Sequence, residues 1–255
     1  WQGVFQLTAS PLTSKPFNVS PVYMDEEVQA TAARLVRRLK EGNHTITVAE
    51  SCTGGLLASA FTDIAGASQW FRQSWVTYSN DAKIKELGVT EEALNRRGAV
   101  SAEVAIQMAQ GARVKADASI ALSITGIAGP SNDGSNKKIG TVYVGIASEN
   151  WANSDITEIG GNRAENKIAF VHFALLTAIK YWDRAMAKAE VARKEEESRV
   201  AAEEDAKLQF EEERAKREAE AKENAPWQDD AWDGDKSTLS KEIMGHEVNW
   251  DKEKD

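Results

Sequence analysis

Two adjacent side chains with nucleophilic chemistry, Ser51 and Cys52, stand between a strand-like and a helix-like segment, in the stretch ESCTGG. A sharp turn into a helix leaves the first backbone N–H groups of that helix without partners, and such groups can bind an oxyanion or a phosphate. We expect the amides of Thr53, Gly54 and Gly55 to do so, with the glycines letting a substrate approach the backbone. The same letters also fit a plain turn in which the serine caps the helix.

A nucleophilic serine needs a group that removes its proton. The histidines are poor candidates, because His44 lies at a turn, His172 in a mostly apolar helix and His246 in an acidic segment. The sequence therefore gives no support to a Ser-His-Asp triad. A lysine kept neutral by its surroundings is the alternative base. Lys83 and Tyr78, in WVTYSNDAK, lie where a strand gives way to a helix, an edge at which α/β proteins place their sites. Taken alone, the lysine would be assigned to the surface.

The hydrophobic pattern predicts strands that alternate with helices, and hence an α/β protein with a layered β-sheet flanked by helices. Two apolar, β-branched runs have no helix between them, so we expect a mixed sheet rather than a purely parallel one. The predicted strands are 45–49, 73–79, 118–124, 141–147 and 155–159, and the predicted helices start near Asp25 and cover 55–64, 81–87, 91–97, 102–115 and a segment from Arg163.

The C-terminal part of the chain differs from the rest in composition. Residues 185–224 are rich in Ala, Glu, Lys and Arg, with opposite charges four residues apart, which predicts a long solvated helix. Its apolar positions are too sparse to favour a stable coiled coil. We therefore divide the chain into an extended arm (1–24), an α/β domain (25–184), the charged helix (185–224) and an acidic tail (225–255). The tail is expected to be disordered, and its tryptophans are candidates for docking on a protein partner.

Charge and cysteine content exclude several function classes. The formal net charge of −9 lies in the last 71 residues, since residues 1–184 carry 18 basic and 18 acidic side chains. This balance argues against nucleic-acid binding and favours a small molecule or a protein as partner. A single cysteine, Cys52, allows no internal disulfide or multi-cysteine metal site and fits the cytoplasm. We expect no membrane span and no signal peptide.

Five stretches, in order, carry a resemblance to a known family: AESCTGG, FRQSWVTYSNDAK, RRGAVS, SITGIAGP and GTVYVGIA. Together they resemble the CinA C-terminal domain family, the PncC-type nicotinamide-nucleotide amidohydrolases, over about residues 25–182. The resemblance implies a deamidase of pyridine nucleotide salvage. It would convert nicotinamide mononucleotide into nicotinic acid mononucleotide and ammonia, with no metal and no organic cofactor. It also implies a homo-oligomer.

The resemblance assigns the catalytic roles. It implies that Ser51 is the nucleophile and that Tyr78 and Lys83 act with it. Acid–base chemistry is compatible with these roles, and we expect a neutral Lys83 to take the serine proton directly or through the phenol. Ammonia would then depart, and the acyl group of the substrate would remain bound to the serine. Neighbouring side chains at a helix start point about 100° apart. We therefore expect Cys52 to face away from the substrate and to be buried and inert.

The resemblance also names substrate-binding residues. They are Thr125, Gly126 and Ala128 in the TGIAGP loop, and Arg163, the last residue of a Gly-Asn-Arg stretch, for the substrate phosphate. An arginine can hold a phosphate with two N–H groups at once. As a lone residue it would more often lie on the surface.

Two departures from the family pattern leave alternatives open. Asn162 stands where the family has an aspartate, and the loop SNDGSNKK replaces a glycine pair and a Lys-Pro. A different nucleotide or pyridine amide is therefore a possible substrate. A non-catalytic scaffold, which uses the charged helix and the Trp-containing tail on a retained deamidase fold, is the alternative of another class.

Overall fold

A computed structural model of the protein describes residues 25–132, 134 and 136–224. The expected N-terminal arm (1–24) and acidic tail (225–255) lie outside the described residues. The described residues belong to two compact units, one ending at Lys188 and one beginning at Ala189. The first unit holds the sheet and all the residues with candidate chemistry.

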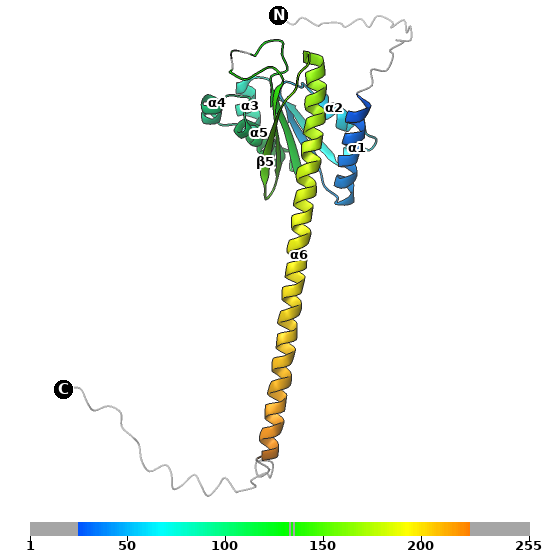
Figure 1. The fold of residues 1–255 in the computed structure, drawn as a ribbon, viewed down its shortest axis with the longest axis vertical. Coiled ribbons are helices and arrows are strands. Elements are labelled where there is room, and N and C mark those ends of the chain that lie inside the picture. The colour runs from blue at the N-terminus through cyan, green and yellow to red at the C-terminus, as the bar shows by residue number, and fades with distance from the viewer. Residues whose placement is uncertain (1–24, 133, 135, 225–255) are drawn as a thin grey trace, which may run out of the picture. The chain divides into compact units, whose positions relative to one another are not determined.

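The first unit is built on a five-stranded sheet with the order β2-β1-β3-β4-β5 (Figure 1). The central strand β1 pairs in parallel with β2 and β3, whereas β3–β4 and β4–β5 are antiparallel. The predicted mixed sheet is confirmed, because a loop and not a helix connects β3 to β4. The strands are β1 Ile46–Glu50, β2 Phe71–Val76, β3 Ile120–Gly126, β4 Thr141–Ser148 and β5 Ala152–Glu158.

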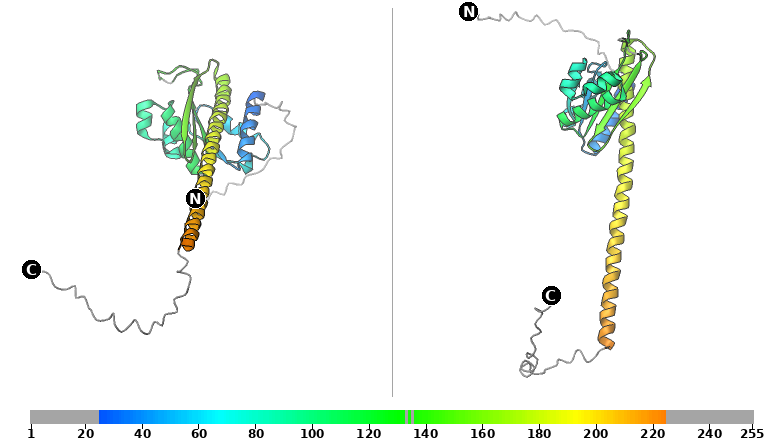
Figure 2. Two further views of the ribbon diagram at one scale, coloured as in Figure 1. Left: turned by 60° about the horizontal axis from the view of Figure 1, so that its bottom comes forward. Right: turned by 90° about the vertical axis from the view of Figure 1, so that its left-hand side faces the viewer.

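Helices cover both faces of this sheet (Figures 1 and 2). One apolar core lies between the sheet and α1, α2 and the first part of α6, and a second lies between the sheet and α3, α4 and α5. The helices are α1 Glu26–Glu41, α2 Leu56–Thr62, α3 Asn80–Leu87, α4 Glu91–Arg97, α5 Ala102–Ala116 and α6 Arg163–Asn224, with a short 3-10 turn at Ala67–Gln69. The arrangement is a three-layer α/β/α sandwich.

Close packing of α5 fixes the layer next to the candidate site. A Cβ atom on Gly111 would lie 1.8 Å from the carbonyl oxygen of Leu87, and one on Gly145 would lie 2.2 Å from the carbonyl oxygen of Ala105. Both distances are far below van der Waals contact, so only glycine allows these approaches. The two glycines therefore let α5 press against the end of α3 and against β4.

Predicted and observed element bounds differ by a few residues. The second strand, predicted at 73–79, is observed as Phe71–Val76, and the fifth, predicted at 155–159, is observed as Ala152–Glu158. Ser79 accounts for the early end of the second strand, because its side chain accepts a hydrogen bond from the amide of Ala82 and caps α3. This cap makes Asn80 the first residue of the helix.

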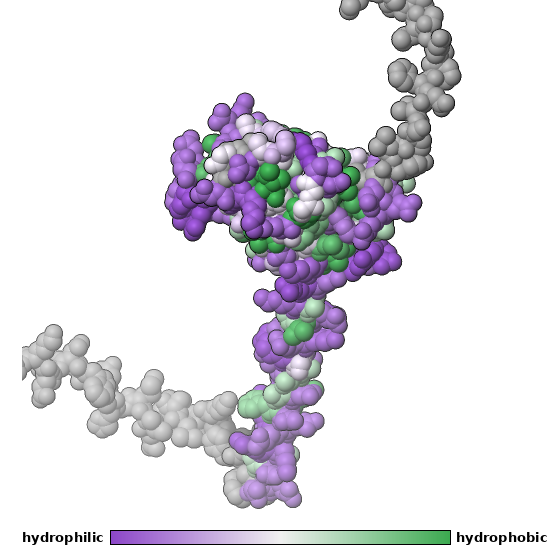
Figure 3. All heavy atoms as spheres, turned by 45° about the horizontal axis from the view of Figure 1, so that its top comes forward, coloured by the Kyte–Doolittle hydropathy of each residue, from purple (hydrophilic) through white to green (hydrophobic). Residues whose placement is uncertain are grey.

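The second unit contains the charged part of α6. Every residue from Ala189 to Asn224 is exposed, and hydrophilic side chains cover most of the visible face of this segment (Figure 3). Ion pairs three or four residues apart join its turns, and each contributes about 0.2–0.5 kcal/mol. They include Arg193–Glu197, Lys194–Glu190, Arg199–Glu203, Arg214–Glu218 and Arg217–Glu213. The predicted long charged helix is confirmed. None of the helices in the described part of the chain is long and apolar enough to cross a membrane.

Candidate active site

The SCTGG turn connects β1 to α2 at the C-terminal edge of the parallel strands. Ser51 is buried, and its amide donates to the carbonyl oxygen of Ile124 on β3 at 3.1 Å. Gly54 and Gly55 have φ angles of +65° and +101°, values that side chains disfavour. The backbone conformation of the turn accounts for these glycines. Our interpretation that they clear space for a substrate is therefore not needed.

A buried carboxylate fixes the turn. Glu50, the last residue of β1, is fully buried, and its oxygens accept hydrogen bonds from the Thr53 hydroxyl at 2.7 Å and from the amides of Gly55, Leu57 and Ala58 at 3.0, 3.1 and 2.8 Å. The negative charge thus sits at the N-terminal end of α2, where the helix dipole favours it.

The prediction that the amides of Thr53, Gly54 and Gly55 bind an anion of the substrate does not agree with the structure. The Gly54 amide donates to the carbonyl oxygen of Ser51 at 3.2 Å, the Gly55 amide donates to Glu50, and none of the three predicted residues lines the cavity described below. The helix start already holds an anion of the protein itself. In the described part of the chain, the turn amides without a hydrogen bond to another residue are those of Cys52 and Thr53.

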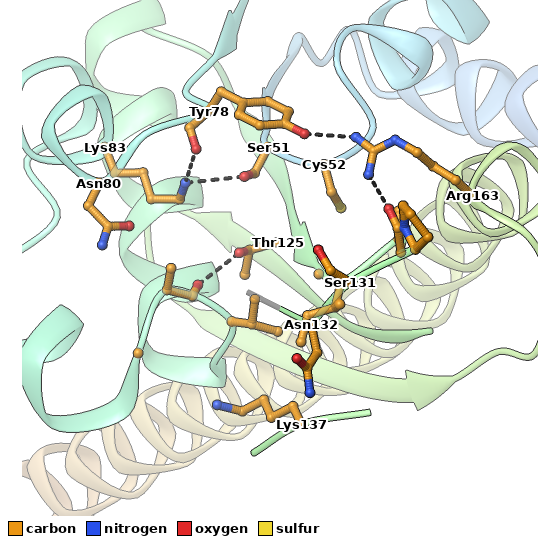
Figure 4. Close-up of a pocket in the computed structure, with 18 residues that line it drawn as sticks. Ser51, Cys52, Tyr78, Asn80, Lys83, Thr125, Ser131, Asn132, Lys137 and Arg163 are labelled. Atoms are coloured by element: carbon orange, nitrogen blue, oxygen red, sulfur yellow. Dashed lines mark hydrogen bonds between the residues drawn. The ribbon is translucent and has the colours of Figure 1, made fainter. Parts of the chain in front are cut away.

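Lys83 contacts the serine directly. Lys83 is 1% exposed, and its Nζ atom donates to the carbonyl oxygen of Thr77 at 2.8 Å. Nζ also donates to Ser51 Oγ at 3.2 Å (Figure 4). A longer contact of 3.5 Å reaches the carbonyl oxygen of Tyr78. Burial lowers the pKa of this amine to about 8, because the charged form is deprived of water. A minor fraction of the lysine is therefore neutral near physiological pH and able to accept a proton.

The thiol of Cys52 lies beside the serine on the cavity wall. The expectation that it would face away from the substrate is wrong, since both neighbours line the cavity. Burial raises the pKa of the thiol to about 12. The thiolate is the reactive form of cysteine, so the group is poorly nucleophilic at neutral pH. Its burial agrees with the expected inert role, which remains a prediction.

Tyr78 and Arg163 form a bridge on another wall of the cavity. The phenol oxygen accepts from Arg163 Nη2 at 2.8 Å, and Nη1 of the same arginine donates to the carbonyl oxygen of Gly129 at 2.5 Å (Figure 4). The tyrosine side chain is 61% exposed. The phenol thus points to Arg163, and the expected proton route from Ser51 through the phenol to Lys83 does not match this geometry.

These groups surround one cavity of about 530 Å³, a size usual for small-molecule sites. Three basic side chains line it, those of Lys83, Lys137 and Arg163, and no acidic side chain of the described residues does. The predicted residues that it brings together are Ser51, Tyr78, Lys83, Thr125, Gly126, Ala128 and Arg163. No cluster of His, Cys, Asp and Glu in the described part of the chain has the geometry of a metal site.

Comparison with known proteins decides the family. The family model of the CinA C-terminal domain matches residues 28–182, more than half of the chain. The chain belongs to the CinA C-terminal domain family. The resemblance of the five sequence stretches is thereby confirmed.

Known relatives of this CinA domain differ in length. The nicotinamide-nucleotide amidohydrolase PncC of Escherichia coli K12 is 47% identical over 123 residues, which are 48% of this chain and 74% of the relative. A CinA-like protein of Chlorobium limicola is 43% identical over 173 residues, 66% of this chain and 40% of the relative. The chain thus spans well under half the length of that relative.

A solved structure supports the same assignment. The competence/damage inducible protein CihA of Agrobacterium tumefaciens superposes with a TM-score of 0.60 at 37% identity, covering 62% of this chain and 97% of that protein. The observed three-layer fold is therefore the fold of the CinA superfamily.

Two residues of the CinA domain that organise the site were missed in the sequence. One is Glu50, described above. The other is Asn166, which is fully buried and donates from Nδ2 to the carbonyl oxygens of Ala128 and Gly161 at 3.1 and 2.9 Å. It lies four residues before Phe170, on the buried face of α6. The sequence did contain a signal for Asn166, because its amide side chain occupies a position at which the helical pattern calls for an apolar residue.

Asn162 has a local role at the start of α6. Its Oδ1 atom accepts from the amides of Ala164 and Glu165 at 2.9 and 3.2 Å, and its own amide donates to the Glu165 carboxylate at 2.9 Å. This reciprocal pair is a capping box. The asparagine, which stands where the family pattern has an aspartate, thus keeps the helix start that carries Arg163.

Proposed function

We propose that the protein hydrolyses the carboxamide of nicotinamide mononucleotide, giving nicotinic acid mononucleotide and ammonia. The observation that carries the proposal is the 3.2 Å contact between Lys83 Nζ and Ser51 Oγ on the wall of a cavity of substrate size. A serine activated by a neutral lysine is a sufficient nucleophile for amide hydrolysis. The activity named for the Escherichia coli relative supports the choice of amide.

The first half of the reaction forms an acyl-enzyme. Neutral Lys83 accepts the hydroxyl proton while Ser51 Oγ attacks the amide carbon, and the carbonyl oxygen becomes an oxyanion. The amide of Cys52 is the candidate donor to this oxyanion, since Cys52 lines the cavity and its amide has no hydrogen bond to another described residue. Protonated Lys83 then gives its proton to the departing nitrogen, and ammonia leaves.

The second half regenerates the enzyme. A water molecule in the place of the ammonia gives a proton to Lys83 and attacks the ester carbon. The tetrahedral intermediate collapses, the C–O bond to Ser51 breaks, and the lysine returns the proton to Oγ. Both halves use the same base, whose lowered pKa of about 8 lets it act in either direction near neutral pH.

Charge supports an anionic substrate. Besides Lys83, which acts in its neutral form, the cavity carries basic side chains from the loop before β4 and from the start of α6, with no acidic side chain of the described residues among its lining. A phosphate is attracted to such a lining, whereas free nicotinamide is neutral. Arg163 has two N–H groups engaged with Gly129 and Tyr78, and a guanidinium has five, so some remain for a phosphate oxygen.

A substrate series tests this proposal. Ammonia release is measured with the full chain and equal concentrations of nicotinamide mononucleotide, nicotinamide riboside and nicotinamide. We expect the mononucleotide to be the best substrate, with at least a tenfold higher kcat/KM than the riboside. Equal rates on all three would contradict the phosphate argument. A complete lack of ammonia release would favour the scaffold alternative.

A further inference from the structure

We propose that Glu50 is a positioning residue for the reaction, holding the nucleophile and the base in register without touching the substrate. This inference rests on the proposed function. The side chain is fully buried, yet it does not line the cavity, so it has no direct route to a bound nucleotide. Its contacts instead reach the turn that contains Ser51 and the loop before α3, the helix that carries Lys83.

The first set of contacts fixes the turn of the nucleophile. Four donors converge on the carboxylate, the hydroxyl of Thr53 and three amides from Gly55 to Ala58. The two glycines with positive φ give this turn little intrinsic rigidity. Bonds to a charged acceptor are about twice as strong as neutral ones. The hydrogen bonds to Glu50 thereby restrict the conformation of a turn that the glycines would leave flexible, immediately beside Ser51.

A second set of contacts runs from the backbone of the same residue to the base. The carbonyl oxygen of Glu50 accepts from the amide of Thr77 at 2.8 Å, and the carbonyl oxygen of Thr77 accepts from Lys83 Nζ at 2.8 Å. One residue therefore links the turn of the serine to the loop that aims the amine. The distance between Oγ and Nζ depends on both links.

The carboxylate also decides where the oxyanion binds. It occupies the N-terminal end of α2, so a negative charge of the substrate cannot use the amides of Gly55, Leu57 and Ala58. The amide of Cys52, next to Ser51 on the cavity wall, is left for that task. Loss of the carboxylate is expected to loosen the oxyanion donor and the nucleophile together, while the cavity walls that bind the nucleotide stay in place.

The test compares two variants with one control in the full chain. Glu50→Gln keeps the shape but replaces one acceptor oxygen with an NH2 group that cannot accept. Thr53→Val removes one donor and leaves the carboxylate, and it guards against a folding failure of the first variant. Thr47→Val is the control, because it deletes a buried hydrogen bond of the same strand, to the carbonyl oxygen of Gln73, away from the turn.

Steady-state ammonia release from nicotinamide mononucleotide gives kcat and KM separately. We expect kcat to fall about tenfold to a hundredfold in Glu50→Gln and about threefold to tenfold in Thr53→Val, with KM within about twofold of the parent, because small misplacements of reacting groups act on the chemical step. Thr47→Val is expected to lose thermal stability and to keep its kcat.

The possible outcomes separate the two proposals. A parent protein that releases no ammonia refutes the proposed function itself. An active parent whose Glu50→Gln and Thr53→Val variants keep the parental kcat, or lose activity through a raised KM, overturns the positioning role. An equal fall of kcat in Thr47→Val also overturns it, because general destabilisation of the strand would then explain the loss.

Discussion

Replacement of Lys83 by methionine tests whether its amine is held in an environment that disfavours charge. Methionine has a similar length and no charge, so Lys83→Met removes the cost of burying an ammonium group. It also leaves Ser51 Oγ and the carbonyl oxygen of Thr77 without this donor. The two effects oppose each other, and pH separates them.

The magnitude follows from the shift in the pKa of the amine. The value falls from 10.5 to about 8 on folding, and at 1.36 kcal/mol per pKa unit this costs about 3 kcal/mol whenever the lysine is charged in both states. Below pH 8 both states bind the proton and the cost is fully present. Between pH 8 and 10.5 only the unfolded chain binds it, so stability of the parent rises with pH. Above 10.5 both are neutral and the cost is gone.

Urea unfolding of the parent and of Lys83→Met, followed by fluorescence at a series of pH values, measures this cost. Other titrating groups cancel in the difference between the two proteins. We expect the free energy of unfolding of the parent to rise by about 3 kcal/mol relative to that of the variant between pH 7.5 and 10.5. The variant also loses hydrogen bonds, which costs about 1–3 kcal/mol where a buried group is left unsatisfied. This loss adds a part to the stability difference that does not change with pH. A difference that does not change with pH would refute a perturbed Lys83.

Three further predictions concern activity. The kcat/KM for nicotinamide mononucleotide should rise with pH through an apparent pKa of about 8, about fivefold from pH 7 to 8, because only neutral Lys83 is a base; a flat profile from pH 6 to 9 would contradict this. Tyr78→Phe should raise KM about threefold to tenfold by releasing Arg163, with kcat nearly unchanged; a hundredfold loss of kcat would restore the phenol as proton relay. Removal of residues 189–255 should leave kcat and KM unchanged, since the described residues of that segment are exposed and none lines the cavity.

The sequence predicted the architecture because its signals are local. The apolar, β-branched runs that predict strands and the opposite charges four residues apart in 185–224 each depend on a few neighbouring residues. The lack of a helix between the third and fourth strands was enough to predict an antiparallel pair. Bounds were shifted where a side-chain cap, such as Ser79, set the first helical residue.

The site was less accessible because its contacts are distant in the sequence. Ser51 and Lys83 are 32 residues apart, and no spacing rule joins them. Lys83 became a candidate base because the histidines were poor candidates, and only the family resemblance paired it with Ser51. Glu50 was overlooked because a glutamate at the end of a strand usually faces water. The hydrogen-bond donors to its carboxylate come together only when the turn folds back on the end of β1.

Ammonia release from nicotinamide mononucleotide by Ser51→Ala, Cys52→Ala and the parent tests the central claim most directly. The two variants delete one heteroatom each from neighbouring residues of the same cavity. We expect Ser51→Ala to lose at least a thousandfold in kcat and Cys52→Ala to stay within about threefold of the parent, because the thiol is protonated and the serine has the base. Activity retained in Ser51→Ala and lost in Cys52→Ala would contradict the account.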